Sequence, residues 1–298
     1  MGGFRFKEKV EAGFINSSPT LRIPPLTDIR ALEAASKQSE ARNELPDKRW
    51  LVQLIQPGTS LGGARPKASV VDSDGALCIA KFPSRKDDYD TELWEHLCHL
   101  LAKSAGITVA DTRVLQTSET HHTLISRRFD RTGQGRRIHF ASAMTLLGLH
   151  DGDNATNGYG YLDIVDFIIR HCTEVESNLR ELYRRVAFNI CVGNSDDHFR
   201  NHGFLLTPKG WTLSPAYDIT PTLNRHQSLL VTASSNEANL SLLSDAAEEY
   251  MLSRNVANAI ISEVCDALRD WQSVATRVGI AKREIAFFEE RWKLLTNC

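Results

Sequence analysis

A run of ionisable residues between an apolar helix and an apolar hairpin is the feature that most narrows the fold of this chain. In SNLRELYRRVAFNICVG, apolar residues recur at helical spacing and Gly193 ends the predicted helix. The loop NSDDHFRNH follows at once, and GFLLT and WTLS then flank Pro208 to Gly210 as a predicted hairpin. Connecting loops rarely hold so many acidic and histidine residues. We therefore expect this helix and hairpin to position a polar site.

The first part of the chain is predicted to be rich in strands. Two β-rich runs, ASVV and ALCIAKF, flank Ser73 to Gly75 as a hairpin. The segment DTELWEHLCHLLAKSAGI has helical periodicity and ends at Gly106, and strands are expected in TVADTRVLQ and HTLISRRFD. A further helix is predicted from Asp28 to Arg42. The fold class is therefore α/β (α+β), with a strand-rich N-lobe over 1–130 and a helical C-lobe over 131–298.

The composition fits a folded, soluble protein. The chain has 298 residues, of which 42% are hydrophobic and 24% charged, and a formal net charge of −2. A chain of this charge is not expected to bind nucleic acid directly, because such binding depends on a basic surface. Since no apolar run approaches the length of a membrane span, we expect a cytoplasmic protein with no membrane contact.

Two features of the strand-rich part favour anion binding. The turn GTSLGGARPK contains Gly58, Gly62 and Gly63, which allow backbone N–H groups to turn toward an anion. Lys81 shares a strand face with Leu77 and Ile79, so we expect it to point to an interior or a cleft and to need an anionic partner. A phosphate group would serve, and so would Glu92 at the start of the following helix.

Three polar residues in the second part of the chain have the order that is typical of a protein-kinase core. Asp196 and Asn201 are five positions apart after the helix, and Asp218 follows the hairpin. In a protein-kinase core, an Asp accepts the proton of the substrate hydroxyl, while an Asn and a later Asp hold Mg²⁺. Carboxylates are needed there because phosphoryl transfer develops charge on oxygens that metal, lysine and N–H groups must stabilise.

A metal-dependent hydrolase is the alternative interpretation of the same loop. Asp196, Asp197, His198 and His202 could bind a transition metal, since the two histidines have a helical ligand spacing. Glycines on both sides argue against a helix through the loop, and this interpretation leaves Lys81 and the Gly-rich turn unexplained. The histidines are instead expected to brace the loop, with His198 in the place of the histidine of kinase catalytic loops.

The motifs GTSLGGARPKA, CIAKFPS, ISRRFDR, NICVGNSDDHFRNHGFLL and LSPAYDITPT together resemble the HipA-type serine/threonine kinases, toxins of bacterial toxin–antitoxin systems. The resemblance runs from about Gly58 to Thr222 and implies a two-lobed kinase fold using ATP and Mg²⁺. It implies Asp196 as catalytic base, Asn201 and Asp218 as Mg²⁺ ligands, and a hinge for adenine from Ser126 to Phe129. It also implies autophosphorylation on Ser60, or secondarily on Thr59. The expected ATP-site residues are Gly58, Ser60, Gly62, Gly63, Lys81, Glu92, Arg127, Phe129 and His198.

The resemblance also implies partners and a substrate. The chain is similar to short, split members of the family that lack an extra N-terminal subdomain, for which a separate small protein can supply the missing piece. A helix-turn-helix antitoxin is expected as partner and an aminoacyl-tRNA synthetase as substrate. Two alternatives stay open: a small-molecule kinase with the same Asp, Asn and Asp logic, or a pseudokinase that binds partners without turnover.

Overall fold

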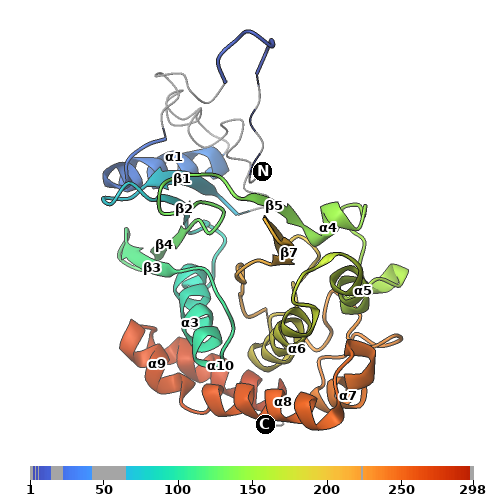
Figure 1. The fold of residues 1–298 in the computed structure, drawn as a ribbon. Helices are drawn as coiled ribbons and strands as arrows, with labels where there is room; N and C mark the ends of the chain where they lie inside the picture. The colour runs from blue at the N-terminus through green and yellow to red at the C-terminus, as the bar shows by residue number, and fades with distance from the viewer. Residues whose placement is uncertain are drawn as a thin grey trace. The chain divides into compact units, whose positions relative to one another are not determined.

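The computed structural model describes residues 3, 5, 7–14, 23–41, 65–222 and 224–295 of the chain (Figure 1). The chain divides into two compact units. The first unit comprises Met1–His96 and Ala110–His139, and the second comprises Leu97–Val109 and Phe140–Cys298. None of the helices among the described residues is both long enough and apolar enough to span a membrane.

The first unit is built on an antiparallel sheet with the strand order β1-β2-β4-β3. The strands are β1 (Lys67–Val71), β2 (Leu77–Lys81), β3 (Thr112–Gln116) and β4 (His122–Arg127). The predicted hairpin is confirmed, because Val71 pairs with Leu77 and Gly75 takes a φ of 80° in the turn. A left-handed φ is open to glycine at little cost, which explains the residue at this turn.

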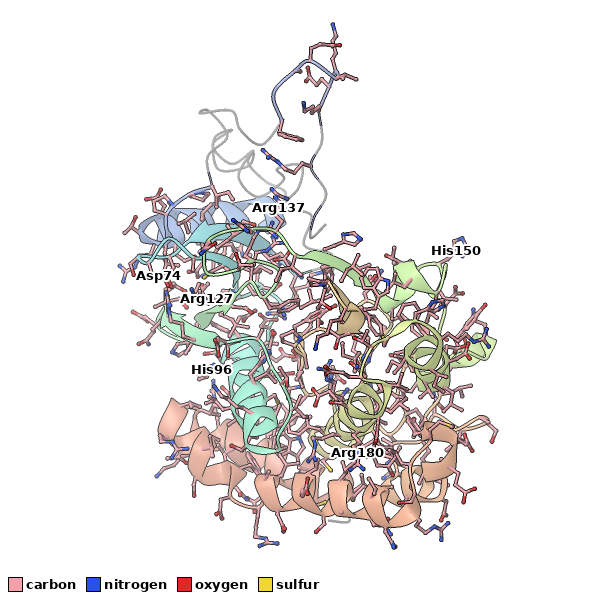
Figure 2. All side chains as sticks on the ribbon, viewed as in Figure 1. Asp74, His96, Arg127, Arg137, His150 and Arg180 are labelled. Atoms are coloured by element: carbon pink, nitrogen blue, oxygen red, sulfur yellow. The ribbon has the colours of Figure 1, made fainter. Side chains whose placement is uncertain are left out.

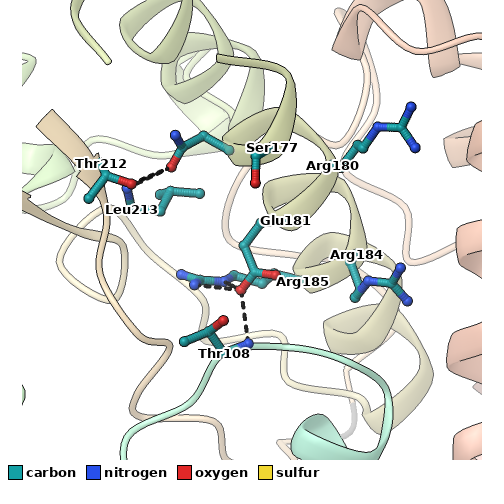
Figure 3. A pocket seen from close by; sticks show the side chains of 9 residues that line it. Thr108, Ser177, Arg180, Glu181, Arg184, Arg185, Thr212 and Leu213 are labelled. Carbon is teal, nitrogen blue, oxygen red and sulfur yellow. Dashed lines mark hydrogen bonds and ion pairs between the residues drawn. The ribbon is translucent and has the colours of Figure 1, made fainter. Parts of the chain in front are cut away.

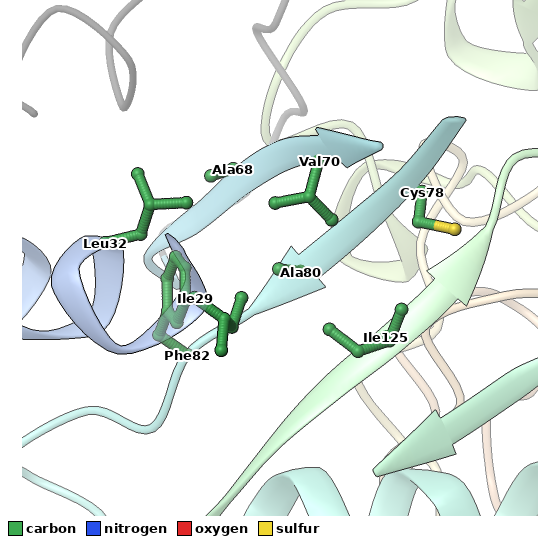
Figure 4. Close-up of a cluster of buried hydrophobic side chains, with 8 residues drawn as sticks. All are labelled: Ile29, Leu32, Ala68, Val70, Cys78, Ala80, Phe82 and Ile125. Carbon is green, nitrogen blue, oxygen red and sulfur yellow. The ribbon is translucent and has the colours of Figure 1, made fainter. Parts of the chain in front are cut away.

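A small apolar core lies between this sheet and α1 (Ile29–Ala41), which follows the 3-10 turn η3 (Leu26–Asp28) (Figure 4). Its buried members are Ile29, Leu32, Ala68, Val70, Cys78, Ala80, Phe82 and Ile125. Cys78 and Ala80 therefore point into the core from β2. Because side chains alternate along a strand, Lys81 stands on the opposite face, as its position in the sequence predicts.

Helix α3 (Thr91–Ser104) follows β2, and Gly106, two residues beyond its end, has a φ of 78°. Asp90 stands just before the helix, and its Oδ1 accepts a hydrogen bond from the backbone N–H of Leu93 at 3.4 Å. An aspartate in this place satisfies an N–H group that the first helical turn leaves without a partner. The predicted helix is thus confirmed, and it carries two glutamates in its first two turns.

The second unit combines a short sheet with helices. The sheet has the order β5-β6-β7, with β5 (His139–Ser142), β6 (Gly203–Thr207) and β7 (Gly210–Leu213). Helix α6 (Val175–Val192) contacts α5 (Tyr161–His171) and α8 (Arg254–Leu268). The other elements are α4 (Ala143–Leu146), η4 (Ala155–Asn157), α7 (Leu240–Asp245), η5 (Ala247–Tyr250), α9 (Trp271–Val278) and α10 (Lys282–Leu295).

The hairpin predicted after the ionisable loop is confirmed as β6 and β7, paired from Phe204–Leu213 to Thr207–Gly210. Gly203 at the start of β6 allows a close approach. A Cβ atom there would lie 2.2 Å from Cε2 of Phe140 and 2.9 Å from Oγ of Ser214. A larger residue would therefore push the start of the strand, and the loop before it, away from its neighbours.

Candidate active site

Lys81 is buried and forms an ion pair at the end of β2. Its Nζ lies 2.7 Å and 2.8 Å from the two carboxylate oxygens of Glu95 on α3. Both side chains are at most 10% exposed. The anionic partner expected for Lys81 is therefore present, but the prediction that Glu92 fills this role is wrong. Glu92 and Glu95 are three positions apart and so lie on the same side of α3, and the helix presents the second of them to the lysine.

Glu92 instead holds Arg65, the first described residue of the Gly-rich turn. Nη2 and Nε of Arg65 lie 2.6 Å and 3.1 Å from Oε1 of Glu92, and the same guanidinium makes two bonds to Asp87 at 2.9 Å and 2.6 Å. Burial raises the pKa of Glu92 to about 7, although the nearby Arg65 charge opposes that rise. The part of the turn that contains Gly58, Thr59, Ser60, Gly62 and Gly63 lies outside the described residues.

The ionisable loop begins where α6 ends. Gly193 takes a left-handed φ of 67° and donates its N–H to the carbonyls of the last helical turn, as the sequence predicts. Ser195 is then fastened on both sides of its backbone. Its N–H donates to Oγ1 of Thr222 at 3.0 Å, while its carbonyl accepts from the N–H and the hydroxyl of Ser228. The loop is thus tied to segments that follow it in the chain.

The two consecutive aspartates of the loop face opposite environments. Asp196 is exposed, whereas Asp197 is 3% exposed. Three donors converge on Oδ2 of Asp197, each at 2.8 Å: the hydroxyl of Tyr161, Nδ2 of Asn189 and Nε2 of His202. Burial acts to raise the pKa of Asp197, but the charge and hydrogen bond of His202 and the Tyr161 hydroxyl outweigh it, so this pKa lies below its usual value. Asp196 is consequently the carboxylate that is open to a substrate.

Asn201 and Asp218 are held by their immediate neighbours. The hydroxyl of Tyr217 donates to the carbonyl of Arg200 at 2.6 Å, which joins the residue before Asp218 to the residue before Asn201. The amide of Asn201 also donates to the carbonyl of Asp196 at 3.3 Å. Asp218 has a left-handed φ of 60°, which costs energy for a residue with a Cβ and is common at functional sites.

These residues fit a magnesium ion that is bound together with phosphate. Across the described segments, no three acidic, histidine or cysteine side chains gather as a metal site. The described loop therefore lacks the metal cluster that the hydrolase interpretation requires, because Asp197 and His202 bond to each other instead. Magnesium usually takes one or two protein carboxylates and completes its shell with phosphate oxygens and water. The amide oxygen of Asn201 and the carboxylate of Asp218 are suitable partners for that arrangement.

The remaining predicted ATP-site residues have varied surroundings. Among the described residues, the buried Nδ1 of His198 is one of a few side-chain atoms with no hydrogen-bond partner, so a bound group could satisfy it. Arg127 is exposed at the end of β4 and pairs with Asp74 of the β1–β2 turn at 2.8 Å (Figure 2). Phe129 is half-buried. The adenine-binding role of Arg127 and Phe129 stays a prediction.

A pocket of about 290 Å³ lies beside α6 in the second unit (Figure 3). On its wall, Glu181 accepts from Arg185 at 2.7 Å and 2.9 Å and from the N–H of Thr108 at 3.2 Å. Arg185 also donates to the carbonyl of Ser214 at 2.7 Å. This buried guanidinium therefore secures the chain four residues before Asp218, a support for which the sequence offers only the Glu181–Arg185 spacing of one helical turn.

Comparison with known proteins places these features in a family. Residues 59–272 match the HipA-like C-terminal domain. A putative kinase of Haemophilus influenzae is 25% identical over 197 residues, covering 59% of this chain and 57% of that protein. The serine/threonine-protein kinase toxin HipA of Shewanella oneidensis is 24% identical over 234 residues, covering 70% of this chain and 53% of that protein. The chain thus spans little more than half the length of these relatives.

The fold agrees with the sequence match. A chain of the Shewanella oneidensis complex of HipA, HipB and operator DNA aligns with a TM-score of 0.71 at 16% identity, over 95% of this chain and 73% of that one. This likeness confirms the predicted kinase-like fold. The family match covers well over half of the chain and includes Lys81, the ionisable loop and Asp218. The chain therefore belongs to the family of the HipA-like C-terminal domain.

Proposed function

We propose that this chain is an ATP-dependent protein serine/threonine kinase and the toxin of a toxin–antitoxin system. The observation that carries the proposal is the contrast between the two aspartates of the ionisable loop. Asp197 is buried and its Oδ2 accepts three hydrogen bonds, whereas Asp196 is exposed and its carbonyl accepts from the amide of Asn201. An exposed carboxylate next to two magnesium ligands is the arrangement that phosphoryl transfer to a hydroxyl requires.

Each residue has a chemical role in this proposal. Asp196 would accept the proton of a serine or threonine hydroxyl as that oxygen bonds to the γ-phosphorus of ATP, the bond from this phosphorus to the bridging oxygen breaks, and ADP leaves. Asn201 and Asp218 hold Mg²⁺, and Lys81, kept in place by Glu95, contacts ATP phosphate oxygens. Bound ATP supplies the phosphoryl group, and Mg²⁺ neutralises charge on its oxygens. The names of the relatives support the reaction class, since they include kinases and a serine/threonine-protein kinase toxin.

The biological setting extends the proposal further. We infer an aminoacyl-tRNA synthetase as protein substrate, a helix-turn-helix antitoxin as inhibitor and a small protein partner that complements the chain. Autophosphorylation on Ser60 or Thr59 would add about two negative charges to the Gly-rich turn and so oppose the binding of ATP phosphates. The antitoxin is supported by the similar solved structure, in which HipA stands with HipB and operator DNA.

The test is phosphate incorporation into the chain itself. Wild type and Asp196→Asn are incubated with Mg-ATP, after phosphatase treatment, and their intact masses and modified peptides are compared. We expect phosphate on Ser60 or Thr59 in wild type only. Asp266→Asn, which removes an exposed carboxylate on α8, is the matched control and should behave as wild type. Equal incorporation in Asp196→Asn would remove Asp196 from the mechanism, and phosphate on an added metabolite instead would favour the small-molecule kinase.

A further inference from the structure

Asp197 stands out because it joins the exposed Asp196 to three separate elements. Tyr161 is the first residue of α5, Asn189 lies in the last turn of α6, and His202 immediately precedes β6. All three donate to the same carboxylate oxygen at 2.8 Å. The ring of Tyr161 also packs edge-on against that of His202, with centroids 5.6 Å apart. The backbone at Asp197 is therefore held from three directions.

The Asp197 carboxylate is not suited to act as the catalytic base or as a metal ligand. At 3% exposure it is closed to a substrate hydroxyl, and its Oδ2 already accepts three hydrogen bonds. It belongs to no cluster of metal-binding side chains within the described segments. Buried carboxylates of this kind are retained where full satisfaction of their hydrogen bonds stabilises one local arrangement. The adjacent Asp196 is the residue whose side-chain orientation would affect the reaction.

Asp196 and Asp197 are adjacent in the chain and are joined by one peptide bond. Asp196 is exposed and Asp197 is buried, so fixing the side chain of Asp197 restricts the directions that the Asp196 side chain can take. On the other side of Asp196, Ser195 is held by hydrogen bonds to Thr222 and Ser228. Asp196 thus lies between two anchored residues. Both anchors use their side chains: Oγ of Ser195 lies 2.6 Å from Oγ1 of Thr222, whereas the carboxylate of Asp197 accepts hydrogen bonds from three separate elements.

We propose that Asp197 is the positioning residue of the kinase reaction, and that its bonds to Tyr161, Asn189 and His202 aim the Asp196 carboxylate at the acceptor hydroxyl. This inference rests on the proposed function and adds to it a determinant of the rate of transfer. A base displaced by about 1 Å can lose on the order of a hundredfold in rate while substrate binding persists. Loosening the attachment should therefore lower kcat and leave KM for ATP unchanged.

Tyr161→Phe is the cleanest perturbation, because it removes one hydroxyl and keeps the ring. Tyr183→Phe is its matched control in the same unit. Tyr183 is also fully buried and donates a single hydroxyl hydrogen bond, to the carbonyl of Leu243 at 3.0 Å. We expect Tyr161→Phe to lower kcat on the order of tenfold with KM for ATP unchanged. Tyr183→Phe should change neither value by more than about twofold.

A second pair of variants tests for rescue at Asp197 itself. Asp197→Asn keeps an oxygen that can accept from the three donors, whereas Asp197→Ala keeps none. The asparagine variant should retain at least about tenfold more activity than the alanine variant at saturating ATP. Equal losses in the two variants, with both folded, would contradict positioning through these hydrogen bonds.

Hydrogen exchange of the loop separates this inference from the proposed function. Amides between Asn194 and Asn201 should exchange faster in Tyr161→Phe than in wild type or Tyr183→Phe, whether or not the chain transfers phosphate. Unchanged exchange in Tyr161→Phe would overturn the inference. Faster exchange with an inactive wild type would instead leave the attachment standing and refute the kinase. An active wild type in which Tyr161→Phe matches Tyr183→Phe in kcat would refute the positioning role alone.

Discussion

Replacing Lys81 by methionine should destabilise the first unit by about 3–5 kcal/mol. The magnitude follows from the burial of the pair: the Lys81 side chain is 10% exposed and that of Glu95 is 4% exposed. Methionine occupies nearly the same space but leaves the Glu95 carboxylate without the ammonium that lies 2.7 Å and 2.8 Å from its oxygens. A buried charge that loses its partner costs several times more than an exposed one.

A double-mutant cycle identifies which glutamate the lysine needs. Glu95→Gln and Glu92→Gln are matched changes on neighbouring turns of α3, and each is combined with Lys81→Met. We expect a coupling energy of at least about 2 kcal/mol between Lys81 and Glu95. Between Lys81 and Glu92 it should stay below about 0.5 kcal/mol, because Glu92 bonds to Arg65.

Native-state hydrogen exchange is the suitable measurement, because a chain with two compact units need not unfold in one step. The slowest amides of β2 and β4 report the free energy of opening the first unit. A larger coupling of Lys81 to Glu92 than to Glu95 would refute the ion pair described above. A loss under about 1 kcal/mol in Lys81→Met would show instead that water reaches the pair.

The remaining predictions concern the metal, the Gly-rich turn, the start of β6 and acid stability. Asp218→Ala should abolish the Mg²⁺-dependent part of ATP affinity, as titration calorimetry with and without Mg²⁺ would show. Ser60→Asp should lower ATP affinity by charge repulsion, and an unchanged Kd would reject inhibition through the turn. Gly203→Ala should destabilise the second unit by about 1–3 kcal/mol, measured by urea unfolding, because its Cβ would lie 2.2 Å from Phe140. The depressed pKa of Asp197 stabilises the fold fully above the unfolded value of about 3.9, and this contribution is lost as the pH falls through the folded pKa. Asp197→Asn should therefore flatten the acid side of the curve of Tm against pH.

Local sequence patterns predicted the elements that are determined by residues close together in the chain. The β1–β2 hairpin follows from a turn with glycine, and α6 follows from apolar spacing ended by Gly193. The face of Lys81 follows from strand alternation. The sequence does not reveal β5, because His139–Ser142 is only four residues long and is separated from β6 by the sixty residues 143–202. Such pairing depends on tertiary packing more than on local preference.

The two adjacent aspartates show where prediction from sequence stops. Both have the same local surroundings, and the loop pattern alone does not say which of them turns inward. The choice depends on donors that the fold brings together, since Tyr161 lies 36 positions before Asp197 and Asn189 lies on another helix. Likewise, Glu92 and Glu95 share a side of α3, and the seating of that helix decides which one meets Lys81. For the aspartates, the buried carboxylate is the one that the donors reach; both glutamates are buried, and their positions along α3 decide that Arg65 bonds to Glu92 and Lys81 to Glu95. The sequence thus predicts which residue types form this site. Only the fold shows which of them are free to bind a ligand and which support the structure.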